Sequence, residues 1–456
     1  MFEIRLRGST VGREVLGGVT TFMAMSYIIF VQVGLLGSKG VGMDDGGVLM
    51  AVCISSAAAC MLMGLLANYP IALAPGMGEN FFFAITLVPL MAKFGLGVGW
   101  EMALALTVVA GVLFLLLSTV GFRARILNAI PDALKSGIAA GIGLFIAVVG
   151  FTYGNLVVKG GALLEFPGFR GNLIACLTLA GLAITMVLMA FRVRGALLIG
   201  ILATTVIALL SGKTAAQIPV AWPGGLGKTA GAFASGLGGL WQALPRHWLD
   251  ILIMLFILLF MDLFDTVGTL VAVAKRAGLM HNGALPRAEK ALAADAAGTV
   301  IGGCLGTSTV TSYIESVTGV EAGARTGLAA VVAGAMMLAA MFFRPLVDMV
   351  MGEFAVGGEA KFPTIAPALI IVGAMMLRTI REIDWDDVTE YLPAFLTMIT
   401  MPLAYSISHG IGVGFISYAF GKLVTGRFRE CPLIVYVFAV LFVGRYVIEV
   451  CHPLVP

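Results

Sequence analysis

Charge is scarce in this chain. Asp, Glu, Lys and Arg together make up 12% of its 456 residues, whereas 60% of the residues are hydrophobic. A soluble globular protein carries roughly a quarter of charged residues. Apolar runs of about 18 residues or more recur from end to end, and each is long enough to span a bilayer as a helix. The composition excludes a large soluble domain and predicts an all-α, polytopic membrane protein.

Motifs for metal, redox and nucleotide chemistry are lacking as well. The six cysteines and four histidines form no CxxC pair and no metal-ligand spacing, so neither a zinc site nor a disulfide framework is expected. No P-loop or Rossmann fingerprint is present. No nucleophile–base set indicates an intramembrane enzyme. We therefore expect no cofactor and no metal, no enzymatic activity, and a gradient rather than ATP as the energy source.

The apolar runs fall into two sets separated by a polar, Gly-rich connection around residue 230. A final run at 431–449 leaves the count open, because it is either one more span or the runs around "MPLAYSISHG" form a single broken one. The predicted spans are 14–37, 47–66, 72–91, 102–120, 133–151, 172–191 and 195–211, then 248–274, 290–306, 309–320, 326–343, 363–379, 390–405 and 407–423.

Seven spans per half would place the two halves in opposite orientations, as in the inverted repeats of many secondary transporters. Basic residues cluster in short connections such as "FRARILNAIPDALK", "FRVRG" and "KLVTGRFRE". Short basic loops usually face the cytoplasm. The pattern predicts a multi-pass protein of the cytoplasmic membrane with its N-terminus in the cytoplasm.

Two segments at matching places in the halves are unlike ordinary spanning helices: "NYPIALAPGMGENFFFA" (68–84) and "GTSTVTSYIESVTG" (306–319). Each begins with a Pro- or Thr-rich stretch and becomes polar where the membrane centre is expected. Non-helical backbone is tolerated at that depth only where protein encloses it or it lines a cavity. We expect spans 3 and 10 to be partly extended, to meet near the membrane centre and to form the binding site.

Acidic residues in apolar spans also indicate where the binding site lies. An Asp there costs about 2.5 to 3.5 kcal/mol on insertion scales, so it is retained for a reason. Asp262 and Asp265 are three residues apart and can face one cavity from one side of a helix. Glu79 and Glu315 lie in the two unusual segments, whereas Asp295 lies among small residues that favour packing. One of the rings from Phe81 to Phe83 could stack on a flat ligand.

Several long motifs in one order resemble the adenine/guanine/hypoxanthine (AzgA-like) purine permeases. They include "REVLGGVTTFMAMSYIIFVQ", "ANYPIALAPGMGENFFFA", "DLFDTVGTLVAVAKRAGL", "GTSTVTSYIESVTGVEAGARTG" and "LIIVGAMMLRTIREIDWDDVTEYLPAFLTMITMPLAYSISHG". The likeness covers nearly the whole chain. It implies two inverted repeats of seven spans, with a core domain that moves against a gate domain and substrate bound between them.

The resemblance also implies the domain limits. The core domain would comprise residues 1–125 and 248–345, and the gate domain 126–213 and 346–456. Residues 214–247 would form the extracytoplasmic connection. Family members import purine bases, generally with protons.

Carried over by motif, Asp265 of "FDTVGT" and Glu315 of "YIES" are the expected substrate-contacting acids, with Asn80 of "PGMGEN" as the polar residue of span 3. Their neighbours Phe81, Thr266 and Ser316 complete the predicted substrate site. The candidates for proton coupling are Asp265, Glu315, Asp262 and Glu79. Commoner members carry an apolar residue at Glu79 and many have Pro at Thr309, so the resemblance leaves the preferred base open.

The leading hypothesis is therefore a proton-coupled purine importer. Its expected partners are a purine base, protons and the lipid bilayer, without nucleic acid, and a homodimer is left open. One alternative is an anion transporter of the SulP type on the same fold, although the predicted site holds acids and no Lys or Arg. Another alternative is a channel, which saturable counterflow would distinguish.

Overall fold

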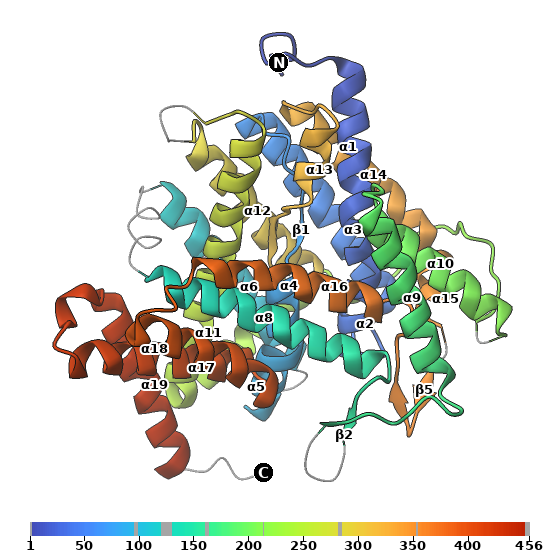
Figure 1. The fold of residues 1–456 in the computed structure, drawn as a ribbon. Coiled ribbons are helices and arrows are strands. Elements are labelled where there is room, and N and C mark those ends of the chain that lie inside the picture. The colour runs from blue at the N-terminus through green and yellow to red at the C-terminus, as the bar shows by residue number, and fades with distance from the viewer. Residues whose placement is uncertain are drawn as a thin grey trace.

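The structure is a computed structural model that describes residues 2–94, 99–119, 130–159, 164–212, 214–280, 285–352 and 354–451. Helices dominate it, with three short two-stranded pairings (Figure 1). The elements of the first half are α1 (Val11–Met25), α2 (Tyr27–Leu36), α3 (Asp45–Leu62), η1 (Met63–Ala67), β1 (Leu73–Pro75), α4 (Met77–Phe81), η2 (Phe82–Leu87), α5 (Val88–Lys93), α6 (Gly99–Thr119), α8 (Asp132–Tyr153), β2 (Val158–Lys159), β3 (Leu164–Glu165), α9 (Leu173–Ala190) and α10 (Ala196–Leu210).

The second half likewise contains long helices and one short strand that precedes a short helix. After η3 (Leu226–Lys228), its elements are α11 (Ala232–Arg276), α12 (Ala288–Leu305), β4 (Val310–Ser312), α13 (Ser316–Glu321), α14 (Gly327–Ala340), η4 (Met341–Phe343), α15 (Arg344–Met351), β5 (Ala355–Val356), β6 (Glu359–Ala360), α16 (Ala366–Met376), η5 (Leu377–Glu382), α17 (Val388–Leu403), α18 (Ile407–Val424), η6 (Phe428–Glu430) and α19 (Leu433–Cys451). The predicted all-α, multi-pass architecture is confirmed.

Seven helical stretches among the described residues are long and apolar enough to cross a bilayer unaided. The other predicted spans are shorter, interrupted or less apolar helices. In span 8 the helix starts well before the predicted residue 248. α11 begins at Ala232 and is kinked at His247, next to Pro245, because proline removes a helical hydrogen bond and clashes with the preceding turn. The last part of the expected connection is therefore helical.

The final apolar run forms one continuous helix, α19, which packs against α18. The Tyr446 ring lies parallel to that of His409 near the start of α18, with centroids 5.8 Å apart. Phe442 and Phe438 lie against Phe415 further along the same helix. The two helices thus run antiparallel. The 431–449 segment forms a helix of its own, and the runs around "MPLAYSISHG" form two helices, α17 and α18, rather than a single broken span.

The two unusual segments meet as predicted. β1 pairs antiparallel with β4, with Leu73 opposite Ser312 and Pro75 opposite Val310. The amide of Tyr313 donates to the carbonyl of Ala72 at 2.9 Å. Backbone groups that lack a helical partner are in this way satisfied by the other half of the chain, which is what a water-free environment requires. These strands place the following short helices at the centre of the molecule.

Two sets of helices pack most extensively among themselves. In one set α14 contacts α1 and α3, and α6 contacts α11 and α12. In the other set α8 packs on α16 and α17, which are seen together across the front of Figure 1. Each set has one crossing where two glycine backbones touch. A Cβ on Gly64 would lie 2.5 Å from the carbonyl oxygen of Gly327, and a Cβ on Gly373 would lie 2.4 Å from that of Gly143.

Candidate functional site

The strand pair is held in place by polar side chains from its neighbours. Thr299 of α12 accepts a hydrogen bond from the amide of Val310 at 3.2 Å and donates to its carbonyl at 3.1 Å. The hydroxyl of Tyr313 donates to the carbonyl of Pro75 at 2.5 Å. These bonds occupy main-chain groups left free where the spans are broken, so the start of α4 and the residues after β4 have fixed positions.

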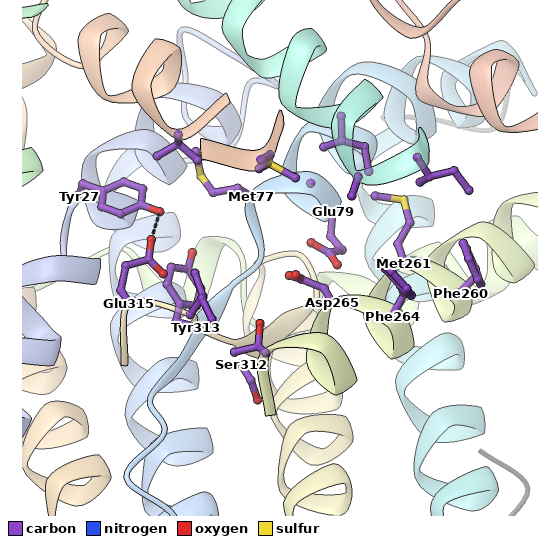
Figure 2. Close-up of a pocket in the computed structure, with 18 residues that line it drawn as sticks. Tyr27, Met77, Glu79, Phe260, Met261, Phe264, Asp265, Ser312, Tyr313 and Glu315 are labelled. Carbon is purple, nitrogen blue, oxygen red and sulfur yellow. Dashed lines mark hydrogen bonds between the residues drawn. The ribbon is translucent and has the colours of Figure 1, made fainter. Parts of the chain in front are cut away.

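A cavity of about 150 Å³ lies beside the two broken segments (Figure 2). A dry cavity of about this volume holds a single benzene-sized ring. Its acidic lining consists of Glu79 from α4, Asp265 from α11 and Glu315 from the loop after β4. Tyr27 and Tyr313 add hydroxyl groups. No Lys, Arg or His is among the described residues that line it.

The carboxyl groups have unequal surroundings. Glu315 accepts a hydrogen bond from the hydroxyl of Tyr27 at 2.8 Å. Glu79 is 2% exposed, and its Oε2 has no hydrogen-bond partner among the residues that the structure describes. Asp265 is exposed to the cavity, and Figure 2 shows its carboxyl group directed toward that of Glu79. Acceptors without matching donors therefore converge here, and a ligand with N–H groups could supply those donors.

The opposite wall of the cavity is apolar. It is formed by Ile138 and Ile142 of α8 and by Val372 and Met376 of α16. Phe264 of α11 adds an aromatic ring at the side. The polar wall and the apolar wall thus come from the two sets of helices described above. Such a site suits a flat ligand that has polar edges and apolar faces.

Asp265 and Glu315 therefore line one cavity, and Glu79 joins them. Four other predicted residues lie outside its lining. Asn80 accepts a hydrogen bond from Ser308, and Thr266 shares one with Thr311 at 2.8 Å. Ser316 accepts a hydrogen bond from the amide of Ala72 at 3.0 Å. Phe81 is fully buried and packs edge-on against Phe145, with centroids 6.3 Å apart.

Asp262 and Asp295 also face away from the cavity. Asp262 is 2% exposed and accepts a hydrogen bond from Thr299 at 3.2 Å. Asp295 is fully buried and accepts one from Ser312 at 3.3 Å. Both acids thus belong to the polar layer behind the strand pair, as expected for carboxylates that stabilise irregular backbone.

Sequence reasoning did not identify Tyr27, Tyr313 or the apolar wall. Tyr313 adjoins Glu315 in "TSYIES", so its place in an irregular segment was a usable signal. Tyr27 comes from the first span, where a tyrosine among apolar residues has no local distinction. The residues of α8 and α16 reach the cavity only through tertiary packing, which no local pattern reports.

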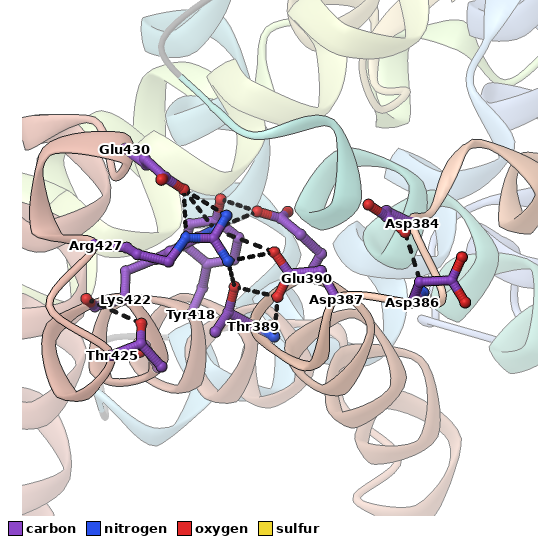
Figure 3. A network of polar contacts seen from close by, with 11 residues as sticks. Asp384, Asp386, Asp387, Thr389, Glu390, Tyr418, Lys422, Thr425, Arg427 and Glu430 are labelled. Carbon is purple, nitrogen blue, oxygen red and sulfur yellow. Dashed lines mark hydrogen bonds and ion pairs between the residues drawn. The ribbon is translucent and has the colours of Figure 1, made fainter.

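A second cluster of charge lies at the ends of α17 and α18 (Figure 3). Lys422 is 1% exposed, and its Nζ lies 2.7 Å from Glu390 and 3.2 Å from Glu430. Arg427 forms ion pairs with Asp387 at 2.5 Å and with Glu430 at 2.6 Å. A hydrogen bond from the Thr389 hydroxyl, followed by one from Arg427, lowers the pKa of Asp387 to about 2. Asp387, Glu390 and Glu430 thus each have a cationic partner, unlike the acids of the cavity.

Comparison with known sequences gives one family and close relatives. Residues 12–413 match the model of the Permease family. The guanine/hypoxanthine permease PbuG of Bacillus subtilis is 42% identical over 454 residues, which cover 98% of each chain. The adenine permease AdeP of Escherichia coli is 37% identical over 461 residues, 99% of this chain and 96% of the relative.

Comparison with solved structures supports the fold alone. The transmembrane domain of the cyanobacterial bicarbonate transporter BicA superposes with a TM-score of 0.62 at 16% identity. The superposition covers 87% of this chain and 97% of that domain. The inverted-repeat architecture expected from the sequence is therefore shared with transporters of distant sequence.

Proposed function

The chain belongs to the Permease family, and we propose that it is a secondary transporter that imports purine nucleobases of the adenine, guanine and hypoxanthine class. The observation that carries this proposal is the cavity in which Glu79, Asp265 and Glu315 converge opposite an apolar wall. Purine bases are flat and present N–H donors at their edges. Carboxylates accept such donors, and the wall from α8 and α16 would cover a ring face.

In this proposal Asp265 and Glu315 accept hydrogen bonds from purine N–H groups. The aromatic ring of Phe264, which lines the cavity, would replace Phe81 as the stacking residue. Asn80, Thr266 and Ser316 would support the cavity from outside its lining, because their side chains form hydrogen bonds with the strand pair and its neighbours. They would position the cavity rather than touch the base.

The same acids are suited to proton coupling. A carboxylate among apolar residues changes charge when it takes up a proton, and it can do so in exchange for a ligand donor. Asp265 and Glu79 are the leading proton carriers, since neither has a cationic neighbour among the described residues of the lining. The set of helices that holds the acids would move as a core against the set that contains α8 and α16, and thereby carry the base across.

An anion transporter is the alternative suggested by the fold, because the solved relatives include a bicarbonate transporter. The chemistry of the cavity disfavours it. An anion needs positive charge or clustered donors, whereas the described lining offers three carboxyl groups and no basic side chain. The sequence further favours the cytoplasmic membrane with the N-terminus in the cytoplasm, since the short basic connections usually face that side.

Uptake of labelled hypoxanthine into cells that express the chain tests the proposal. Unlabelled adenine, guanine and hypoxanthine should compete, whereas bicarbonate and sulfate should not. A protonophore should abolish accumulation while sodium is held constant. Competition by the anions instead of the bases would refute purine transport. Accumulation that survives the protonophore would refute proton coupling alone.

A further inference from the structure

A second cavity, of about 420 Å³, lies where α5 ends and where α11 is kinked at His247. α18 and α19 close its other side. None of its lining residues lines the cavity of the acids. It also lies apart from the charge cluster around Lys422. The proposed transport function gives it no role.

The fixed part of this cavity is Arg445 of α19, whose side chain is 10% exposed. Its Nε donates to Asp250 of α11 at 2.8 Å. Its Nη1 is buried and has no hydrogen-bond partner among the residues that the structure describes. The ion pair with Asp250 fixes the guanidinium in the wall of the cavity.

The remaining charges make the cavity strongly basic. Lys93 from the end of α5 and Arg246 from the α11 kink also line it. Both are exposed, and neither forms an ion pair within the described part of the chain. Asp250 is the single acid among the described lining residues, and Arg445 already neutralises it. Two positive charges therefore remain without a counterion in a concave site.

We propose that this cavity binds a phosphate group, and that the phosphate is the headgroup of an anionic phospholipid. Arg binds phosphate oxygens through paired N–H donors, and Lys binds phosphate as a point charge. The lipid source follows from the surroundings. Trp248 and Ile448 line the same cavity and are 54% and 51% exposed. Tryptophan is enriched at the membrane interface, and an exposed apolar rim suits acyl chains.

The headgroup would bridge parts of the molecule that are distant in sequence. Lys93 lies in the first half, Arg246 begins the span of α11, and Arg445 lies on the last helix. Deeper in the bundle Phe256 of α11 stacks on Phe438 of α19, with centroids 3.3 Å apart. A bound phosphate would therefore hold α19 to α11 at their ends, next to a contact that already holds them further in.

Native mass spectrometry of the purified full-length protein tests the site. Phosphatidylglycerol should bind, and phosphate-free diacylglycerol should not. The double variant Lys93→Gln/Arg246→Gln should weaken phosphatidylglycerol binding about 30-fold, since each basic residue contributes about 1 kcal/mol toward an anionic headgroup. Both residues are exposed, so the variant should fold. Arg192→Gln/Arg194→Gln removes two exposed charges elsewhere and should leave binding unchanged.

The outcomes distinguish whether the site exists from whether its phosphate belongs to a lipid. Inorganic phosphate that binds as tightly as the lipid, and is lost in the same double variant, would support the phosphate site but overturn the lipid as its ligand. Equal binding of phosphatidylglycerol to the wild type and the Lys93→Gln/Arg246→Gln variant would overturn the site. So would equal binding of diacylglycerol and phosphatidylglycerol, because acyl chains alone would then account for it.

Discussion

The acids of the central cavity and the acids around Lys422 both belong to an apolar protein, yet they differ in their partners. Those around Lys422 are paired with basic side chains, and those of the cavity are not. Glu390 and Glu430 lie within 3.2 Å of a lysine nitrogen. Asp265 and Glu79 face each other without a basic side chain among the described lining residues. Charges that are neutralised by the fold stabilise it. Carboxyl groups that have no basic partner in the fold are available to a ligand or a proton.

The difference predicts that substitutions will separate stability from binding. A change in the Lys422 cluster should lower stability and leave the intrinsic affinity of the folded protein intact. A change in the cavity should lower the affinity without loss of stability, because its acids form no ion pair within the part of the chain that the structure describes. The four predictions that follow examine this contrast, beginning with the largest expected effect.

Lys422→Met should destabilise the protein by about 3 to 5 kcal/mol, as found when one partner of a buried ion pair is removed. The substitution leaves Glu430 paired with Arg427, and it leaves Glu390 with the Tyr418 hydroxyl as its hydrogen-bond donor among the described residues. Thermal unfolding in detergent measures the loss. Lys290→Met removes an exposed lysine and serves as the control. A midpoint equal to that of the control would show that the cluster is not structural.

Asp265→Asn should weaken purine binding roughly 10- to 100-fold, because a hydrogen bond to a charged group contributes about 1.5 to 3 kcal/mol. Its unfolding midpoint should not fall below that of the wild type, because the amide removes the repulsion between the facing carboxylates of Asp265 and Glu79. Asp262→Asn is the matched control, since Asp262 is bonded to Thr299 behind the cavity. Calorimetry on the two purified variants decides between them. Loss of binding in Asp262→Asn with binding retained in Asp265→Asn would mean that the wrong acid had been assigned.

Glu79→Gln should stabilise the protein by about 1 kcal/mol. The amide removes the repulsion between two facing carboxylates and can donate to Asp265. Uptake should at the same time depend differently on external pH if Glu79 takes part in proton coupling. Unfolding midpoints and uptake rates over a pH series provide the measurements. A lower midpoint would indicate that Glu79 has a donor partner and is a structural acid after all.

Asp387→Asn should have the smallest effect, because solvent screens the ion pair that Asp387 forms with the 40% exposed Arg427 side chain, and the effect should depend on pH. The pKa of Asp387 is lowered to about 2 in the folded protein, against roughly 3.9 in an unfolded chain. Its contribution to stability is therefore complete above the unfolded value and is lost as pH falls through the folded one. The difference between wild type and variant should shrink between about pH 4 and pH 2. A difference that does not change over this range would contradict the assignment.

The sequence predicted the broken segments because their residues violate the pattern of a spanning helix. Pro75 and Thr311 have no place in an uninterrupted apolar span, so extended backbone and enclosure followed. Asp265 and Glu315 were predicted in the same way, since an acid in an apolar run is expensive and must be explained. The line of reasoning works where a residue conflicts with its local surroundings.

It works less well where function depends on the direction of a side chain. Asn80 and Phe81 follow Glu79 directly, yet only Glu79 lines the cavity. The helix that contains them has five residues and continues directly into the π-helical η2. Residue spacing alone therefore does not determine which of its side chains point into the cavity. The Lys422 cluster was likewise read only as part of a basic connection. Its acids and bases are assembled by the packing of α17 on α18.

The pairing of β1 with β4 also bears on how such a chain could arise. Each three-residue strand finds its backbone partner in the other half. A half-length ancestor would have left polar main-chain groups bare in hydrocarbon unless a second copy, inserted upside down, supplied them. The strand pair is thus a backbone contact that neither half can form alone. Two fragments of this chain, divided at residues 214–225, should persist in cells only when both are made together.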